Sequence, residues 1–285
     1  MAEKRMTVRQ SIVWHRLNRV VLYLIIAVLF VLVAFPFYWM IVTSLQPQEF
    51  VMNTPPQLWP KHGTWQNYID AWNSAPWIRY FANTLFVAAA STLLSLLTSS
   101  MAAFAFASID FRGKEVLFNL VLSVMMIPAA TTLIPNFLII RTLGWYDKFW
   151  ALIIPFSTSV FGIFLLRQYF MSTPKELWEA AQIDGASRLR YFRSIALPMA
   201  KPAIVTIAIN TFLGSWTSFL WPTVMTQSQD KQLIEVALRN FLGEKGQQWS
   251  QLAAASVFTT IPILVLFFFV QRQFIEGIGG GSVKG

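Results

Sequence analysis

The chain has 285 residues, of which 55% are hydrophobic and only 12% are charged. Soluble domains carry about 25% charged residues, so this composition excludes an ordinary soluble protein and indicates a membrane protein. The absence of cysteine excludes disulfides and thiol catalysis.

Six windows of the chain contain no charged residue, and they alternate with charged segments. The windows cover residues 20–48, 80–109, 116–140, 149–166, 202–229 and 246–271. A helix needs about 20 apolar residues to cross the hydrocarbon of a bilayer. We therefore predict an all-α membrane protein with six transmembrane helices over residues 20–275, after a basic tail at residues 1–19. The first window is too long for a secretory signal, so we expect it to be retained.

Lysine and arginine fall unevenly between the segments that connect the windows. If the N-terminus is cytoplasmic, 15 of the 22 basic residues lie inside. The positive-inside rule then predicts that both termini and residues 171–201 are cytoplasmic. This topology accounts for most of the net charge of +9, which we do not attribute to nucleic-acid binding.

The first outside loop, residues 44–79, is rich in proline and tryptophan. We expect a turn followed by a short helix at the membrane interface, where tryptophan is enriched. Further along, Pro128 and Pro135 are expected to interrupt the third span close to Asn136. Such breaks occur where a helix lines a polar path, but a kink without function is the more frequent outcome.

The loop between the fourth and fifth spans, residues 172–201, is polar and basic. Pro174 and the acidic residues after it favour a helix start, and Asp184-Gly185 favours a break. A second amphipathic stretch is expected to place Leu189, Phe192 and Ala196 on one face. We predict a helix-turn-helix at the cytoplasmic membrane surface, which on these grounds alone can be a plain basic anchor.

The order of residues in this loop adds a specific pattern. The sequence has Glu179, Ala180, Ala181, Asp184 and Gly185, then nine intervening residues, and then Ile195-Ala196-Leu197-Pro198. This pattern resembles the signature loop of the membrane-spanning subunits of binding-protein-dependent ABC importers. The resemblance implies that Glu179, Ala180, Ala181, Asp184, Gly185, Ile195, Leu197 and Pro198 contact a separate ATP-binding subunit.

The resemblance extends to other parts of the chain. Thr64-Trp65-Gln66-Asn67-Tyr68 and Phe81-Ala82-Asn83-Thr84-Leu85 look like segments of carbohydrate permeases. In maltose-type importers, the loop that corresponds to residues 228–250 reaches toward the sugar-binding protein. The Gly-rich tail, residues 276–285, resembles a terminus that is implied to touch the ATPase dimer. By composition alone it would be a disordered end.

The fifth span carries polar and small residues at helical spacing. Asn210, Gly214, Thr217 and Trp221 are expected on one helical face, which offers an amide, a gap, a hydroxyl and an aromatic plane to a sugar. Helix packing through small and polar residues explains the same pattern equally well. The family commonly has Trp-Asn where this chain has Trp216-Thr217, which puts that polar contact in doubt. With Asn136, these residues are the predicted substrate path.

The sequence lacks the motifs of an enzyme. It contains no Gly-x-x-x-x-Gly-Lys-Ser/Thr loop for ATP, and its two histidines, His15 and His62, are predicted on opposite sides of the membrane. An ion-coupled transporter usually carries ionisable residues within its spans, and the six windows have none. We expect no enzyme activity, metal or cofactor in this chain, with ATP and Mg²⁺ held by the partner.

The function implied by the resemblance is that of a permease in a carbohydrate ABC importer in a bacterial or archaeal inner membrane. The implied partners are an ATP-binding subunit dimer, a second permease in a heterodimer, an extracytoplasmic binding protein and a sugar. A homodimer remains open. A permease for a polyol or glycerol phosphate is the alternative, followed by an ion-coupled transporter.

Overall fold

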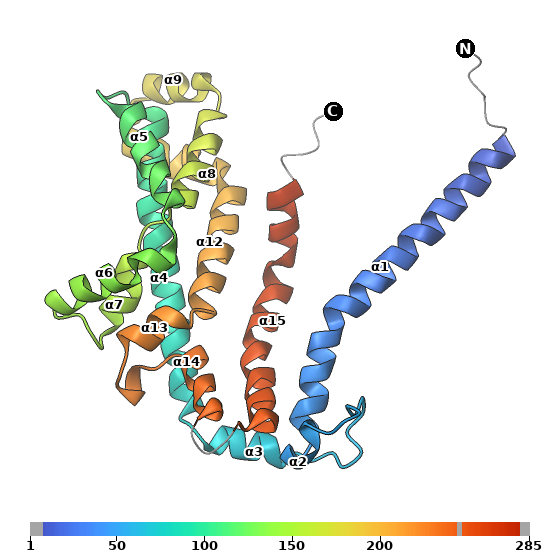
Figure 1. The fold of residues 1–285 in the computed structure, drawn as a ribbon. Coiled ribbons are helices and arrows are strands. Elements are labelled where there is room, and N and C mark those ends of the chain that lie inside the picture. The colour runs from blue at the N-terminus through green and yellow to red at the C-terminus, as the bar shows by residue number, and fades with distance from the viewer. Residues whose placement is uncertain (1–7, 244–246, 280–285) are drawn as a thin grey trace. The chain divides into compact units, whose positions relative to one another are not determined.

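The computed structural model describes residues 8–243 and 247–279, and within these ranges the regular structure is helical throughout (Figure 1). Two compact units divide the chain. The first unit comprises Met1–Ser74 and Phe241–Phe258, and the second comprises Ala75–Asn240 and Thr259–Gly285. The prediction of an all-α protein is therefore confirmed for the described residues.

Four helical segments are long and apolar enough to cross a membrane, and two bent helix pairs raise the number to six if each pair is one span. The four segments are Asn18–Leu45, Trp77–Ser108, Phe149–Met171 and Trp249–Phe269. The pair Lys114–Met126 and Ala129–Thr142 bends by 102°, and the pair Arg188–Met199 and Lys201–Trp216 bends by 78°. The chain is thus a multi-pass membrane protein with four to six spans. The first bent pair covers the third predicted window, whereas the second begins in the predicted loop at 172–201 and extends into the fifth window.

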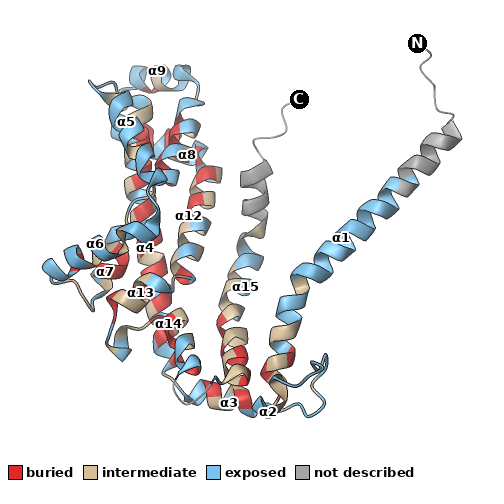
Figure 2. Ribbon diagram, viewed as in Figure 1, coloured by how far each residue is buried: buried red, intermediate tan, exposed pale blue. Residues whose placement is uncertain are grey.

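The first unit is built on α1, which keeps apolar side chains such as Leu24 and Phe30 exposed, as lipid contact requires (Figure 2). The amide of Asn67 caps the end of α1, because Asn67 Nδ2 donates to the carbonyls of Ser44 at 2.9 Å and Gln46 at 2.8 Å. This explains the asparagine of the Thr64–Tyr68 segment. The helices of this unit are α1 (Val8–Leu45), α2 (Gln48–Val51), α3 (Gln66–Asn73) and the start of α15 (Trp249–Gly279).

The second unit is organised around α4, which packs along α8 and α12. One face of α4 carries small buried residues at three- and four-residue intervals, which allow the helices to approach closely. They are Ala88, Ser91, Ser95, Ser99 and Ala103. The hydroxyl of Ser99 donates to the carbonyl of Ser159 at 3.2 Å and accepts from its N–H at 3.0 Å, which fixes α4 against the start of α8.

The remaining helices of the second unit are short, apart from the three that pack together. The α-helices are α4 (Trp77–Ser108), α5 (Lys114–Ser123), α6 (Ala129–Thr142), α7 (Phe149–Ile153), α8 (Val160–Met171), α9 (Lys175–Ile183), α10 (Arg188–Tyr191), α11 (Leu197–Met199), α12 (Lys201–Trp216), α13 (Leu220–Met225) and α14 (Ile234–Leu238). The 3₁₀ and π segments are η1 (Val124–Met126), η2 (Ile154–Phe156), the π-helix η3 (Phe192–Ala196), η4 (Gln229–Lys231) and η5 (Arg239–Leu242), of which η5 runs from this unit into the first.

Two predictions about the spans are corrected. The third span breaks at Pro128, whereas Pro135 lies inside α6 without ending it. The fifth window, 202–229, is not one helix, since α12 ends at Trp216 and the chain turns into α13. At the ends of the chain, α1 already begins at Val8 and α15 continues to Gly279, so the helices include residues predicted as tails. Residues 280–285 of the predicted C-terminal tail lie outside the described residues.

Candidate functional site

A helical turn projects from the second unit at α9 and α10. Pro174 caps the start of α9, and Gly185 follows its end with φ +72°, a left-handed conformation that favours glycine. The N–H of Gly185 donates to the carbonyl of Gln182 at 3.0 Å, and that of Ala186 donates to Ala181 at 2.8 Å. These two bonds make a Schellman motif, which ends α9 and redirects the chain. Ser187 then caps α10 by accepting from Arg190 N at 3.3 Å.

The predicted contact residues differ in exposure along this turn. The exposed ones are Glu179, Ala180, Asp184, Gly185 and Pro198. Ala181 is buried in an apolar cluster with Phe104, Tyr191 and Phe192, and Ile195 and Leu197 pack partly against the same cluster. The turn therefore exposes two carboxylates together with apolar side chains, among them Ile183 at 87%, while its other side is fixed to the bundle.

The predicted buried face of the second stretch is wrong at one position. Leu189 is 54% exposed, and Tyr191 takes its place beside Phe192 and Ala196. The α10 helix has only one turn before it continues as the π-helix η3. A π turn contains an additional residue, so the regular helical period from which the face was predicted does not apply.

A buried arginine joins three helices next to this turn. Arg167 Nη2 lies 3.1 Å from Glu115 Oε1, and Arg167 Nε donates to the carbonyl of Phe106 at 3.3 Å. Its guanidinium also lies 4.0 Å from the ring centroid of Phe118. The sequence analysis counted Arg167 only as a cytoplasmic charge, because its partners are 49 to 61 positions away and give no local signal.

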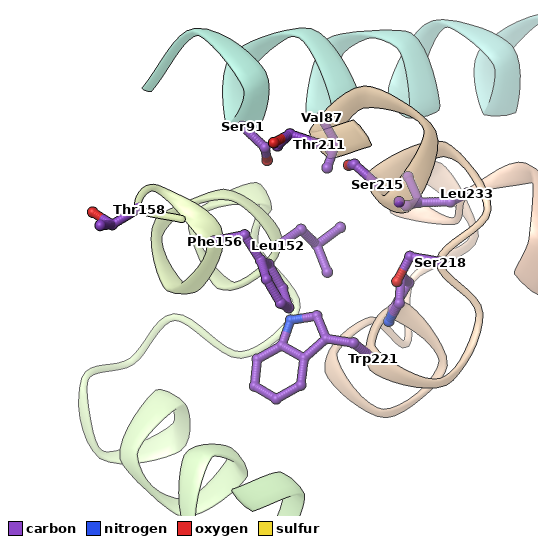
Figure 3. Close-up of a pocket in the computed structure, with 12 residues that line it drawn as sticks. Val87, Ser91, Leu152, Phe156, Thr158, Thr211, Ser215, Ser218, Trp221 and Leu233 are labelled. Carbon is purple, nitrogen blue, oxygen red and sulfur yellow. The ribbon is translucent and has the colours of Figure 1, made fainter. Parts of the chain in front are cut away.

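A cavity of about 280 Å³ lies among α4, α12, α13 and the α7–η2 segment (Figure 3). Figure 3 shows Ser91 of α4 beside Thr211 of α12, and Trp221 facing Leu152 and Phe156. The indole Nε1 of Trp221 donates to the carbonyl of Ala151 at 2.8 Å, which fixes the ring. The lining residues are Val87, Ser91, Leu152, Phe156, Thr158, Thr211, Gly214, Ser215, Ser218, Trp221, Pro222 and Leu233.

The groups that line this cavity are uncharged. Its polar groups are hydroxyls, among them Ser91, whose buried Oγ has no hydrogen-bond partner within the described part of the chain. Its walls otherwise include aromatic and aliphatic side chains. Hydroxyl groups and an aromatic ring suit a solute that has hydroxyls and apolar faces.

The structure brings together only two of the predicted path residues. Gly214 and Trp221 line the cavity, but Trp221 lies on α13, so the prediction of one continuous helical face is wrong. Asn210 and Thr217 are exposed and do not line it, and the hydroxyl of Thr217 donates back to the carbonyl of Leu213 at 2.9 Å. Asn136, on α6, does not line it either. The sequence analysis missed Ser91, Thr211 and Ser218.

The helices that are long and apolar enough to cross a membrane place the chain in the class of multi-pass membrane proteins. Within the described residues there is no group of three His, Cys, Asp or Glu side chains that could hold a metal ion. The family profile described as "Binding-protein-dependent transport system inner membrane component" matches residues 95–279. The chain belongs to this family.

Several relatives match this chain over most of their length. It is 32% identical to the arabinooligosaccharides transport system permease protein AraQ of Bacillus subtilis, over 94% of this chain and 96% of that protein. It is 36% identical to AraQ of Halalkalibacterium halodurans, over 88% and 91%. It is 32% identical to the sn-glycerol-3-phosphate transport system permease protein UgpE of Yersinia enterocolitica, over 90% and 93%.

The fold is also found in a solved structure. A bacterial ABC transporter involved in the import of the acidic polysaccharide alginate contains a chain that superposes with a TM-score of 0.80 at 24% identity, covering 95% of this chain and all of that one. At this identity the likeness establishes the fold.

Proposed function

We propose that this chain is a permease subunit of an ATP-driven importer for an oligosaccharide delivered by an extracytoplasmic binding protein. The observation that carries the proposal is the match to the arabinooligosaccharide permeases over nearly the full length of both chains. Family membership supports a binding-protein-dependent mechanism. The sugar itself is inferred from the relatives, and the hydroxyl-lined cavity beside Trp221 suits it chemically.

In this proposal the chain crosses the membrane six times, and each of the two bent helix pairs contributes one crossing. Both termini and the α9–α10 turn are cytoplasmic, on the basis of the Lys and Arg distribution. The α9–α10 turn, with Glu179 and Gly185 exposed, docks onto a separate ATP-binding subunit. Movements of that subunit then pass through the buried side of the turn to α4 and α8.

The importer is proposed to contain a second, homologous permease and two ATP-binding subunits. The two permeases together enclose the translocation path, and this chain holds no nucleotide itself. A heterodimer is the proposed arrangement, by analogy with the carbohydrate importers that the sequence resembles.

The second candidate substrate is sn-glycerol 3-phosphate. It is favoured by the UgpE relatives, which match at 32% identity over 90% of this chain. A phosphate would require positive charge along the path, whereas the residues that line the cavity are all uncharged. For this reason the oligosaccharide is preferred.

Uptake by reconstituted vesicles tests the proposal. The chain is purified in mild detergent with the subunits that accompany it, and vesicles are supplied with binding protein and radiolabelled arabinooligosaccharide or glycerol 3-phosphate. We expect oligosaccharide uptake with ATP inside and none with ADP. Uptake that follows a proton or sodium gradient without ATP would indicate a secondary transporter, and uptake of glycerol 3-phosphate alone would indicate the second candidate.

Docking of the turn is tested by Glu179→Ala, with Glu176→Ala as the control because Glu176 is also exposed on α9. A hydrogen bond to a charged group is worth about 1.5 to 3 kcal/mol, so loss of the Glu179 contact should weaken ATPase binding about tenfold or more. Equal binding by the two variants would remove Glu179 from the interface.

A further inference from the structure

Residues 226–234, from the end of α13 to the first residue of α14, form a largely irregular segment that side chains from two directions hold in place. We call it the outer segment. It contains η4, and its exposed side chains include Gln227, Gln229 and Asp230. The sequence gives no reason for its shape, because the residues that fix it lie elsewhere in the chain.

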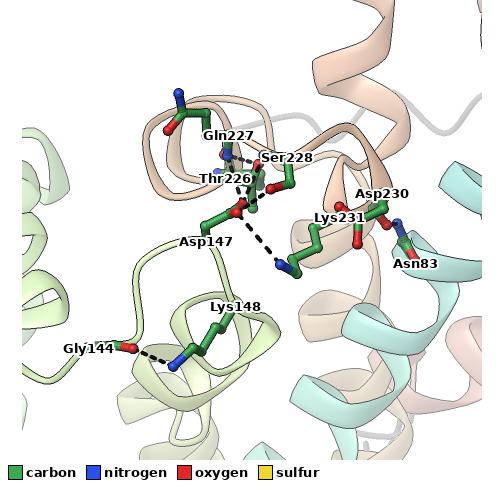
Figure 4. A network of polar contacts seen from close by, with 10 residues as sticks. Asn83, Gly144, Asp147, Lys148, Thr226, Gln227, Ser228, Asp230 and Lys231 are labelled. Carbon is green, nitrogen blue, oxygen red and sulfur yellow. Dashed lines mark hydrogen bonds and ion pairs between the residues drawn. The ribbon is translucent and has the colours of Figure 1, made fainter.

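On one side, Asp147 binds the outer segment through its carboxylate (Figure 4). Its Oδ1 accepts from the N–H of Gln227 at 2.9 Å and from the N–H of Ser228 at 3.0 Å. Its Oδ2 accepts from the Ser228 hydroxyl and lies 3.6 Å from Lys231 Nζ. The Asp147 N–H donates to the carbonyl of Met225 at 2.9 Å. The loop before α7 is thereby joined to the end of α13.

The backbone and the charge of Asp147 agree with this role. Its φ of +58° lies in the left-handed region, which aspartate and asparagine enter more readily than other residues with a side chain. Burial alone would raise the pKa of Asp147, but the hydrogen bonds from Ser228 and from the Gln227 and Ser228 N–H groups, with the nearby Lys231, lower it to about 2. The carboxylate is thus ionised at every physiological pH.

On the other side, α4 binds the outer segment through Asn83 and Thr84. Asn83 Nδ2 donates to the carbonyls of Asp230 at 2.9 Å and Gln232 at 3.0 Å. Thr84 Oγ1 accepts from the N–H of Ile234 at 3.1 Å. These two residues belong to the segment at 81–85 that resembles carbohydrate permeases. The contacts explain why an asparagine and a threonine stand there.

The same elements form the walls of the cavity. Val87 lies about one turn after Thr84 on α4. Leu152 lies on α7, which begins shortly after Asp147. Leu233 comes from the outer segment itself, and both Val87 and Leu233 line the cavity. Because Leu233 belongs to both, a displacement of the outer segment changes the cavity, and the hydrogen bonds at Asp147, Asn83 and Thr84 oppose such a displacement.

We propose that Asp147 is a positioning residue that holds the outer segment against α7 and so keeps the cavity shielded on that side until transport requires it to open. Asn83 and Thr84 hold the same segment to α4. This proposal rests on the proposed function for its effect on uptake, while the effect on shielding is a property of the chain alone.

Thiol labelling tests the shielding without any substrate. The chain has no cysteine, so Ser218→Cys places a single thiol in the cavity lining. Asp147→Ala is added to this variant, and the complete purified importer is treated with a charged, membrane-impermeant thiol reagent. Loss of a hydrogen bond to a charged group shifts an equilibrium about tenfold or more, and we expect labelling to accelerate by a similar factor.

Two matched variants separate positioning from loss of charge or of fold. Asp230→Ala removes a carboxylate of the same segment for which no hydrogen bond or ion pair is found within the described residues, and it should label at the parent rate. Asp147→Asn keeps an oxygen for the two N–H donors and should label at a rate between the parent and Asp147→Ala. Monodisperse elution of every variant with its partner subunits confirms folding.

Uptake measured with the same variants, without the added cysteine, links shielding to transport. Oligosaccharide uptake should fall strongly in Asp147→Ala, partly in Asp147→Asn and not in Asp230→Ala. Equal labelling of Asp147→Ala and its parent would overturn the positioning role. If labelling changes as expected but the parent takes up no oligosaccharide, the proposed function fails while the positioning role stands.

Discussion

Gly185 shows how one residue determines the shape of the candidate docking turn. Its φ of +72° is unfavourable for any residue with a Cβ, although no atom lies within 4 Å of the position that a Cβ would occupy. The constraint is therefore on the backbone and not on space. A left-handed residue with a side chain costs about 1 to 2 kcal/mol, and a β-branched one is worse.

Gly185→Val is expected to distort the turn and to reduce copurification of the ATP-binding subunit, while the chain still inserts into the membrane. Gly185→Asn is the control, because asparagine enters the left-handed region more readily. The ratio of ATPase to permease after affinity purification measures the effect. Normal ratios for Gly185→Val would show that the turn does not need this geometry for docking.

At Gly214 the missing side chain matters for space, whereas at Gly185 it matters for the backbone conformation. Gly214 lines the cavity, and open space surrounds the position of a Cβ at this residue. Gly214→Leu should place its side chain in the cavity and reduce oligosaccharide uptake, without lowering stability, since leucine favours a helix over glycine by about 0.8 kcal/mol.

Asn210→Leu is the control for Gly214→Leu, because Asn210 is exposed on the same helix and does not line the cavity. Uptake into vesicles and thermal unfolding in detergent are measured for both variants. A greater loss of uptake in Asn210→Leu would place the path along the exposed face of α12 and not through the cavity.

Among the helical elements, α4, α5 and α8 are joined by Arg167. Arg167 is 8% exposed, and its guanidinium combines an ion pair, a backbone hydrogen bond and a cation–π contact. Arg167→Ala should lower the free energy of unfolding by about 2 to 4 kcal/mol, from the hydrogen bonds and the ring contact together. Arg167→Lys should lower it less, since lysine keeps the charge but not the planar stacking.

Thermal unfolding in detergent compares these variants with Arg112→Ala. Arg112 is exposed and has no ion pair to another described residue, so its removal should be nearly neutral. If Arg167→Ala unfolds at the same temperature as Arg112→Ala, the three contacts of Arg167 contribute nothing measurable to the stability of the protein.

The sequence predicted elements better than it predicted how they bend or meet. Runs without charged residues identified the apolar segments, because charged side chains are strongly disfavoured at positions within the lipid. Helix starts and stops near Pro174 and Gly185 were also predictable, because capping is local. The end of α12 at Trp216 was not, since the residues after it are equally apolar, and the partners of Asp147 and Arg167 lie far along the chain.

The candidate site was predicted unevenly for the same reason. Gly214 and Trp221 were predicted as substrate-path residues on one helical face. That face does not exist, although both residues line the cavity, and their contact with substrate stays a prediction. Ser91 escaped notice because hydroxyls on α4 also serve helix packing, as Ser99 does. The contact residues of the loop remain a prediction, although their exposure allows docking.

At the scale of the whole molecule, the orientation in the membrane is the main open prediction. The Lys and Arg distribution predicts that α9 is cytoplasmic and that the outer segment is outside, an orientation that puts 15 of the 22 basic residues inside. Single cysteines at Ile183, which is 87% exposed, and at Gln229 test this in intact cells. An impermeant thiol reagent should label Gln229→Cys and not Ile183→Cys. The reverse pattern would invert the topology.

The small-residue face of α4 has a consequence for how this protein can change over generations. Two neighbouring helices, α8 and α12, pack along this helix, so a larger side chain on that face separates α4 from at least one of them. Exchanges among glycine, alanine and serine preserve the spacing, whereas larger side chains would push the helices apart. Adaptation to a new solute is therefore expected to proceed mainly through the cavity residues of α12 and α13, where a change of side chain does not disturb the packing along α4.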